Sequence, residues 1–317
     1  MNVRTCDRLT LTVLVDNFID MLIPSTAAVQ RLGMAEHFTP RRGIPLAENG
    51  ISFLLEVDTA GRRTTILFDA GITGSTLLHN ADVLGVDLTA VDQVVLSHGH
   101  PDHFGGIHEA LAAIGHRVPV VVHPSAFLPR TISKPTQTLL YFNRGLTQDG
   151  LATAGAAVMP LCDPMELAPG VWTTGEIPTV VDFEHEVPAG RLSVRDGRVV
   201  DDMIEDYLGL VVNVRDLGLV VLDPCGHAGV VSCVRRAQEV SRESRVHAVL
   251  GGFHLGHEGI SQEKIDRTVD ALVDLEPALV SPMHCSGERT VRAVAQRMPD
   301  AFVQMTSTSR LTFAAPA

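Results

Sequence analysis

The sequence predicts an α/β protein in which two mixed β-sheets pack face to face and helices cover their outer sides. The chain has 317 residues, of which 45% are hydrophobic, enough to bury a large core. Strand-like stretches precede helical ones in each half of the chain, and the first half is the richer in strands. We expect a single domain over residues 1–317, with an irregular insert or lid at about 124–150.

Alternating apolar and polar residues predict the strands of the N-terminal half. The expected strands are 10–15, 52–57, 65–68, 93–96 and 118–123, and the expected helices are 75–84 and one that begins near residue 106. The stretch 23–50 has weak periodicity, so we expect mostly loop there with one short helix.

The C-terminal half alternates strands and helices more clearly. Residues 207–223 have the pattern of a hairpin, with its turn at 216–218. Strands are expected at 246–252 and 277–284, and helices at 230–241, 261–275 and 287–298. Ser261 is expected to cap the second of these helices.

The segment 124–150 follows neither period. Loops of this length inside a compact domain are often lids or binding loops, and an irregular surface excursion is the alternative. The segment contains cations that could bind an anionic group and aromatic residues that could cover a ring: Arg130, Lys134 and Arg144, and Phe127, Tyr141 and Phe142.

Composition excludes several classes of partner. A net charge of -12 and an aromatic content of 4% argue against nucleic acid and against an anionic membrane surface. The five cysteines are an odd number, widely spaced, which is typical of reduced thiols. The N-terminal stretch alternates like a strand instead of forming a signal peptide, and no window has the roughly 18 apolar residues of a membrane helix. We therefore expect a cytoplasmic protein.

One loop concentrates metal-binding side chains. His98, His100, Asp102 and His103 lie within six positions, directly after the apolar stretch 94–96. In a His-x-His pair on an extended segment both imidazoles point to the same side, so both can reach one ion. The turn that follows can bring Asp102 and His103 to a second position nearby. Imidazole and carboxylate ligands suit Zn²⁺, Fe or Mn²⁺.

This H-x-H-x-D-H pattern after an apolar strand resembles the signature of the metallo-β-lactamase fold superfamily, and "ILFDAG" at 66–71 is similar to the Asp-x-Gly that ends a strand in that family. The strings "TTGEIP", "PCGHAGVVS", "GGFHL" and "HCSG" resemble a subgroup named for dihydropterin aminobenzene-phosphate synthases of methanopterin biosynthesis. The resemblance implies a four-layer αββα sandwich. It also implies that Asp69 orients a ligand imidazole.

Further ligands are expected just after the C-terminal strands, where His227, His254, His257 and His284 lie. The resemblance implies that His284 occupies the last metal-binding position and that His227 is a ligand. Cys225, His254 or His185 could complete the site. For Cys225 an inert buried thiol is the alternative, and for His185 a solvated loop beside Glu184 and Glu186. The predicted metal ligands are His98, His100, Asp102, His103, His227 and His284, and the predicted catalytic residues are Asp102 and His254.

Two other features bear on the substrate. Glycine-containing loops precede the helices expected at 230–241, 261–275 and 287–298, and helix N-termini favour anions. Several residues depart from the subgroup pattern: Asn49, Pro101, Phe104 and the pair Asp223 and Pro224. All of these except Asn49 are expected to change the wall of the site.

We therefore predict a hydrolase with two divalent metal ions, Zn²⁺ first and Mn²⁺ or Fe as alternatives. A metal-bound hydroxide would attack a small anionic substrate, a phosphoester or a cyclic ester. The alternatives are an iron-dependent oxidoreductase in the same pocket and a non-catalytic ligand-binding protein. The substrate itself, the native metal and a homo-oligomeric state stay open.

Overall fold

The computed structural model describes residues 4–33, 43–134, 137–141, 145–184 and 190–315. The strands of this part of the chain form three sheets. The first sheet has the order β2 (Val29–Gln30), β18 (Arg310–Ala314), β1 (Arg8–Val15), β3 (Ser52–Thr59), β4 (Arg62–Phe68), β5 (Gln93–Val95), β6 (Val118–Val122), β9 (Ala156–Pro160). The second has the order β10 (Glu166–Ala168), β11 (Val171–Thr173), β14 (Leu210–Val214), β15 (Gly218–Asp223), β16 (Val246–Gly252), β17 (Leu279–Met283).

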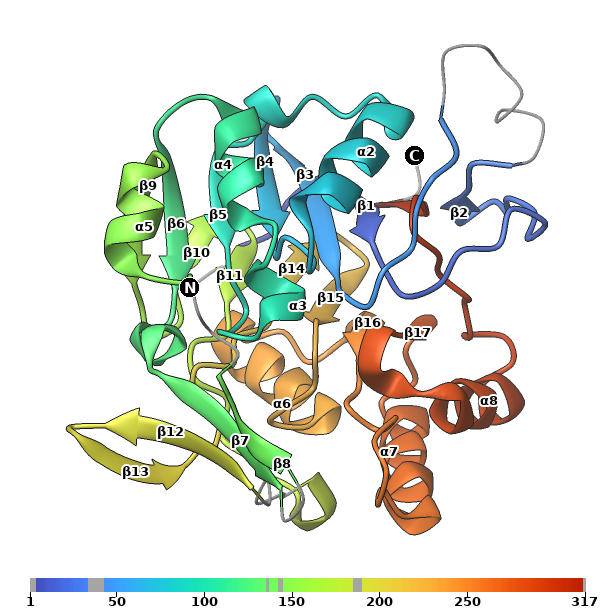
Figure 1. Cartoon of the computed structure of the whole chain (residues 1–317). Coiled ribbons are helices and arrows are strands. Elements are labelled where there is room, and N and C mark those ends of the chain that lie inside the picture. Colours follow the sequence, from blue (N-terminus) through green and yellow to red (C-terminus); the bar gives the residue numbers. More distant parts are fainter. Residues whose placement is uncertain (1–3, 34–42, 135–136, 142–144, 185–189, 316–317) are drawn as a thin grey trace.

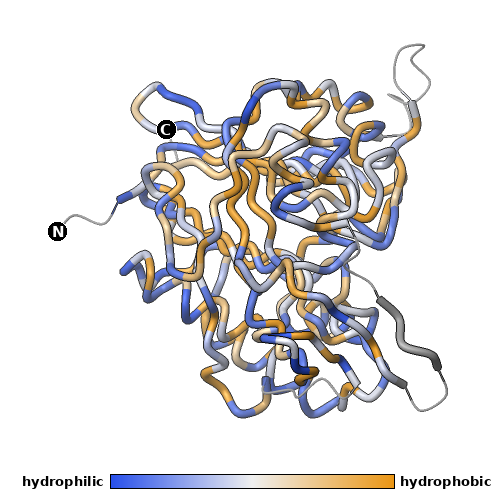
Figure 2. Tube along the Cα trace, turned by 60° about the vertical axis from the view of Figure 1, so that its left-hand side comes forward, coloured by the Kyte–Doolittle hydropathy of each residue, from blue (hydrophilic) through white to orange (hydrophobic). Residues whose placement is uncertain are grey.

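Both large sheets are mixed and their inner faces form the central core. β4, β5, β6 and β9 pair in parallel in the first sheet, as do β15, β16 and β17 in the second. Side chains alternate between the faces of a strand. Val212 of β14 accordingly packs between the sheets with Leu11 and Phe53, whereas its neighbour Val211 faces the helices. In Figure 2 the hydrophobic strands run through the middle of the molecule.

Helices cover both outer faces (Figure 1). The helices of the first sheet are α2 (Gly74–Leu84), α4 (Ile107–Ile114) and α5 (Gln148–Thr153), and those of the second are α6 (Val230–Ser241), α7 (Gln262–Asp274) and α8 (Glu288–Arg297). Each presents an apolar stripe to its sheet: Ile107 and Leu111 of α4 on one side, Ile265 and Val269 of α7 on the other. Ser261 caps α7 by accepting from Lys264 N, as predicted. The predicted αββα class is confirmed.

The third sheet was not predicted. Its order is β13 (Arg198–Asp201), β12 (Arg191–Arg195), β7 (Arg130–Lys134), β8 (Gln137–Tyr141). It falls partly within the segment 124–150 that we expected to be irregular, where β7 and β8 form a hairpin. β12 pairs with β7, and Arg191 lies opposite Ile132. Sequence analysis missed this because the pairing joins segments about sixty residues apart. The single domain and the lid role of this segment stay predictions.

The parallel strands bring four connections to one place. β5, β15, β16 and β17 are each followed by one of the loops that carry the histidines singled out above. Carboxyl ends of neighbouring parallel strands lie at the same edge of a sheet, where ligands of α/β proteins bind. The described residues include no helix with both the length and the apolar character needed to span a membrane.

Candidate metal centre

The loop after β5 is held by a buried carboxylate. Asp69, which follows β4, accepts hydrogen bonds from Ser97 N, Ser97 Oγ and His103 Nδ1, each at 2.7 Å. Ser97 Oγ in turn lies 2.9 Å from His98 Nδ1. Because Asp69 can only accept, the proton of His103 lies on Nδ1. The Ser97 hydroxyl donates its own proton to Asp69, so it accepts from His98, whose proton therefore also lies on Nδ1. Nε2 of each ring is then the free electron-pair donor, as a metal ligand requires.

The turn expected at Asp102 and His103 is a single helical turn, α3 (Pro101–Phe104). Proline at the first helical position is favourable, since its missing N–H would have no partner there. Gly99 before it has a packing role: a Cβ on this residue would lie 2.4 Å from Ala126 O and 2.6 Å from Arg130 Nη1. A side chain at position 99 would therefore push the loop away from β7.

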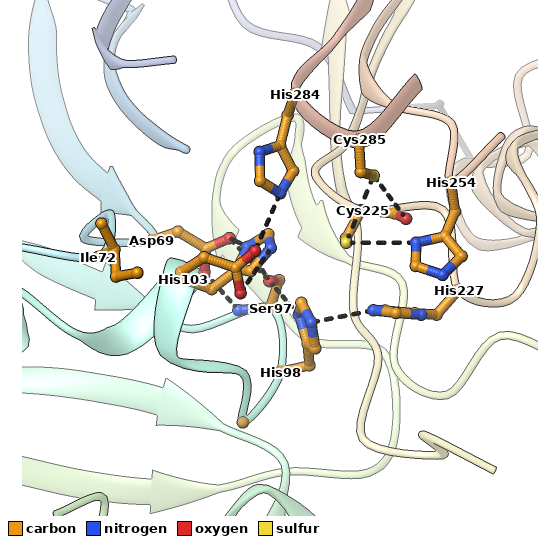
Figure 3. A network of polar contacts seen from close by, with 12 residues as sticks. Asp69, Ile72, Ser97, His98, His103, Cys225, His227, His254, His284 and Cys285 are labelled. Carbon is orange, nitrogen blue, oxygen red and sulfur yellow. Dashed lines mark hydrogen bonds and ion pairs between the residues drawn. The ribbon is translucent and has the colours of Figure 1, made fainter. Parts of the chain in front are cut away.

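Two histidines of this loop meet one from the second sheet. His98 Nε2 and His227 Nε2 are 3.1 Å apart, and a dashed line joins the two side chains in Figure 3. One ligand atom from each of His98, His100 and His227 lies within 4.8 Å of the other two. Burial lowers the pKa of all three imidazoles, that of His100 to about 3. They are neutral at pH 7, which is the form that binds a metal. We call these three residues the first donor set.

A second donor set consists of Asp102, His103 and His284, whose ligand atoms also lie within 4.8 Å of one another. His284 Nε2 is 3.4 Å from Asp102 Oδ2, and His103 Nε2 is 4.0 Å from Asp102 Oδ1. His284 Nδ1 lies 3.0 Å from Asn17 Oδ1, which directs Nε2 toward Asp102. Burial would raise the pKa of Asp102, but His103 and His284 hold it well below its usual range.

His103 Nε2 supplies the test of whether this arrangement fits a metal ion. It is fully buried and has no hydrogen-bond partner among the described residues. Leaving a buried polar atom without a partner costs about 1–3 kcal/mol. A cation held by the second donor set would remove this cost, and imidazoles with a carboxylate are the ligands that Zn²⁺, Fe and Mn²⁺ accept. The residues present therefore fit such an ion.

A third group of side chains lies beside these sets. Cys225 Sγ is 3.5 Å from Cys285 Sγ and 3.7 Å from His254 Nδ1, which is itself 3.3 Å from His257 Nε2. His254 is buried, and its ring lies 4.1 Å from that of His227, centroid to centroid. His254 thus lies next to the first donor set, where the sequence placed an additional ligand or a proton donor.

Three residues of the site have left-handed backbone conformations that non-glycine residues seldom adopt. Asp69, His254 and His284 have φ angles of 59°, 53° and 45°, and each lies one or two residues after the end of a strand. Such conformations cost of order 1–3 kcal/mol and cluster at functional sites. The turn in each case re-aims a side chain toward the common space seen in Figure 3.

A cavity of about 220 Å³ opens onto both donor sets. Its lining comprises His100, Pro101, Asp102, Ile132, Arg191, Cys225, His227, His254, His257 and Cys285. Arg191 of β12 is the cation of this lining, and sequence analysis did not find it because nothing local distinguishes it from other surface arginines. A larger cavity of about 560 Å³ shares His227 and is lined by Tyr207, Glu176 and Arg236 among others. Apart from His227, the described residues that line this larger cavity belong to neither donor set.

Several expectations about charged residues were wrong. Arg130, expected to bind a substrate anion, is 1% exposed and pairs with Asp206 and Asp202. Glu184, expected in a solvated loop, is buried and accepts from Val231 N and Ser232 N at the start of α6. This N-terminus is therefore already occupied by a carboxylate and does not offer its N–H groups to a substrate.

Of the remaining residues that the sequence suggested as substrate contacts or ligands in these segments, the structure describes the side chain of Phe127 but not those of the others. Phe127 packs against the core between the first sheet and its helices instead of covering a ligand. The others lie outside the described residues, or in strands whose side chains are not described: His185, Glu186, Lys134, Tyr141, Phe142 and Arg144.

Comparisons with known proteins agree with the architecture. The sequence profile of the metallo-beta-lactamase superfamily matches residues 49–284. The chain is 32% identical over 262 residues to a 7,8-dihydropterin-6-methyl-4-(beta-D-ribofuranosyl)-aminobenzene-5'-phosphate synthase of Methanocaldococcus jannaschii, covering 82% of this chain and 88% of that protein.

Two solved structures share the fold. A metal-dependent hydrolase of the β-lactamase superfamily superposes with a TM-score of 0.72 at 24% identity, covering 96% of this chain and 99% of the other. A diphosphatase of the PhnP family gives 0.50 at 16% identity, covering 96% and 97%. The sequence profile and the methanogen relative establish the family, and the two structures agree with the fold. The chain belongs to the metallo-β-lactamase superfamily.

Proposed function

We propose that this protein is a cytoplasmic hydrolase that holds two divalent metal ions and cleaves a small anionic ester, either a phosphoester or a cyclic ester. The observation that carries the proposal is the pair of donor sets, three residues each, that face one another in a buried space. His98, His100 and His227 would hold one ion, and Asp102, His103 and His284 the other. Zn²⁺ suits these ligands first, with Mn²⁺ or Fe as alternatives.

When bound, such a pair of ions supplies a nucleophile from water at neutral pH and polarises a phosphoryl or acyl oxygen. The side chains do the rest. Asp69 and Ser97 fix the tautomers of His98 and His103. Asp102 is ionised, because its pKa is held low, and can accept a hydrogen bond from the attacking water. His254 at the cavity wall would donate a proton to the leaving group.

An anionic substrate is supported by Arg191. Arg191 lines the cavity together with His227 and Asp102, and no ion pair joins it to another described residue. Arg191 can therefore pair with a phosphate or carboxylate oxygen of a substrate. The superfamily relatives named above include a diphosphatase and a synthase whose product carries a 5'-phosphate, in line with a phosphoryl substrate for this chain.

The test is turnover by protein loaded separately with Zn²⁺, Mn²⁺ and Fe. Phosphodiesters, phosphomonoesters, diphosphates and lactones would be supplied as substrates, and metal content measured in the same samples. We expect hydrolysis in at least one ester class with close to two ions per chain. Absence of hydrolysis across the panel with two ions bound would reject the proposal. Iron on isolation together with oxygen consumption would favour the oxidoreductase instead.

Replacing Arg191 with leucine should raise KM for the anionic substrate by about tenfold to a hundredfold, since a hydrogen bond to a charged group is worth about 1.5–3 kcal/mol. The turnover number should change much less, because the contact binds ground state and transition state alike. Steady-state kinetics would measure both constants. Arg198→Leu, on the exposed strand β13, is the matched control. An unchanged KM in Arg191→Leu, or equal effects of the two variants, would contradict a substrate-binding role.

A further inference from the structure

One thiol lies between the two donor sets. Cys225 Sγ is within 4.8 Å of ligand atoms of His98 and His103. It is also within 4.8 Å of a ligand atom of His227 and of one of His284. His98 and His227 belong to the first donor set, and His103 and His284 to the second. Figure 3 shows this sulfur in the space that these rings surround. Cys225 therefore has the position that a group shared by two ions must have.

The surroundings of the thiol point to a missing cation. Cys225 is 3% exposed, and among the described residues the polar contacts of its sulfur are the weak ones with Cys285 Sγ and His254 Nδ1. His103 Nε2, within 4.8 Å of it, is fully buried and has no hydrogen-bond partner among the described residues. Buried polar atoms are nearly always partnered. A metal ion bound here would be coordinated by both His103 Nε2 and Cys225 Sγ.

The backbone holds Cys225 in this position through Tyr207. The hydroxyl oxygen of Tyr207 accepts from Cys225 N and Gly226 N, both at 2.8 Å, and its proton is donated to Asp223 at the end of β15. Asp223, the carboxylate at the end of β15, is thus hydrogen-bonded to Tyr207. Cys225, two residues further along the chain, lines the cavity.

We propose that Cys225 is a metal ligand whose thiolate bridges the two ions. This inference rests on the proposed dinuclear site. A thiolate is a soft ligand, so it favours Zn²⁺ or Fe over Mn²⁺ and narrows the choice of native metal. Cys285 is assigned no bridging role, because its thiol donates to Cys225 O at 3.3 Å.

The test is replacement of the native metal by Co²⁺ in the full chain. A thiolate bound to Co²⁺ gives an intense near-ultraviolet charge-transfer band, whereas imidazole and carboxylate ligands give only weaker visible bands. We expect the wild type to bind two Co²⁺ and show the charge-transfer band, and Cys225→Ser to lose it. Cys285→Ser, the matched control, should keep it. Metal affinity of Cys225→Ser should fall more than about tenfold.

Each other outcome is decisive. Two bound Co²⁺ ions without the band in the wild type, or a band that survives in Cys225→Ser, would reject the thiolate bridge and leave the dinuclear site intact. Failure of the wild type to bind Co²⁺ would reject both. If Cys225→Ser does not fold, zinc-edge X-ray absorption of the wild type still decides, since a bridging thiolate places one sulfur about 2.3 Å from each Zn²⁺. Only nitrogen and oxygen neighbours would overturn the proposal.

Discussion

Substitution of His227 or His284 by alanine is expected to remove one of two bound ions and to lower kcat/KM by more than about a hundredfold. Loss of a residue that merely orients a ligand already costs about 10–100-fold in metal affinity or activity. His227 and His284 belong to different donor sets, so each variant should lose a different ion. Metal analysis after dialysis, with kinetics on the same samples, would measure both effects.

His116 provides the matched control. It is exposed in the connection after α4, and its ring nitrogens lie near the backbone oxygens of Arg117 and Thr89. His116→Ala should keep two ions and full activity. Two ions and unchanged kinetics in His227→Ala would show that this residue is not a ligand, even though its Nε2 lies 3.1 Å from His98 Nε2.

Asp206→Asn should lower the free energy of unfolding by about 3–5 kcal/mol, the usual cost of removing one partner from a buried ion pair. Asp206 is fully buried, and its Oδ2 accepts from Arg130 Nη1 at 2.9 Å and from Gly99 N at 2.7 Å. The substitution leaves the Arg130 charge buried with Asp202 alone. It also loosens the His98–His100 loop, so metal affinity should fall with stability. Denaturant unfolding of both forms would measure the loss.

The sign of the pH dependence follows from the same carboxylate. Burial opposes the charge on Asp206, but Arg130 outweighs it and lowers the pKa below its ordinary value of 3.8. A carboxyl group whose pKa is lower in the folded state stabilises the protein above pH 3.8, and this contribution is lost as pH falls through the folded pKa. Asp201→Asn, at the exposed end of β13, is the control and should stay near wild type. Equal unfolding curves for the Asn variants at positions 201 and 206 would refute the structural role of Asp206.

The sequence predicted those parts of the fold whose signal is local. The hairpin of β14 and β15 and helix α7 have clear periods and turn or cap residues within a few positions, and both form as predicted. Strands β12 and β13 have a weak pattern and few buried side chains. β12 pairs with β7 of a hairpin about sixty residues away, which no local pattern encodes, and β13 pairs with β12.

The same distinction applies to the site. His98, His100 and His103 form a compact motif, so their convergence was predictable from spacing alone. The burial of Arg130 by Asp206 and the capping of α6 by Glu184 join residues 76 and at least 47 positions apart. Arg130 therefore looked like a free cation in the sequence and Glu184 like a solvated acid. Cys225 could be named as a candidate, but its position between the donor sets needed the fold.

Anomalous scattering from crystals of the zinc-loaded protein tests the central claim most directly. Data on both sides of the zinc absorption edge would locate each ion without reference to activity. We expect two peaks, one among the imidazoles of His98, His100 and His227 and the other among Asp102, His103 and His284. A single peak away from these side chains, or none at full zinc occupancy in solution, would contradict the account.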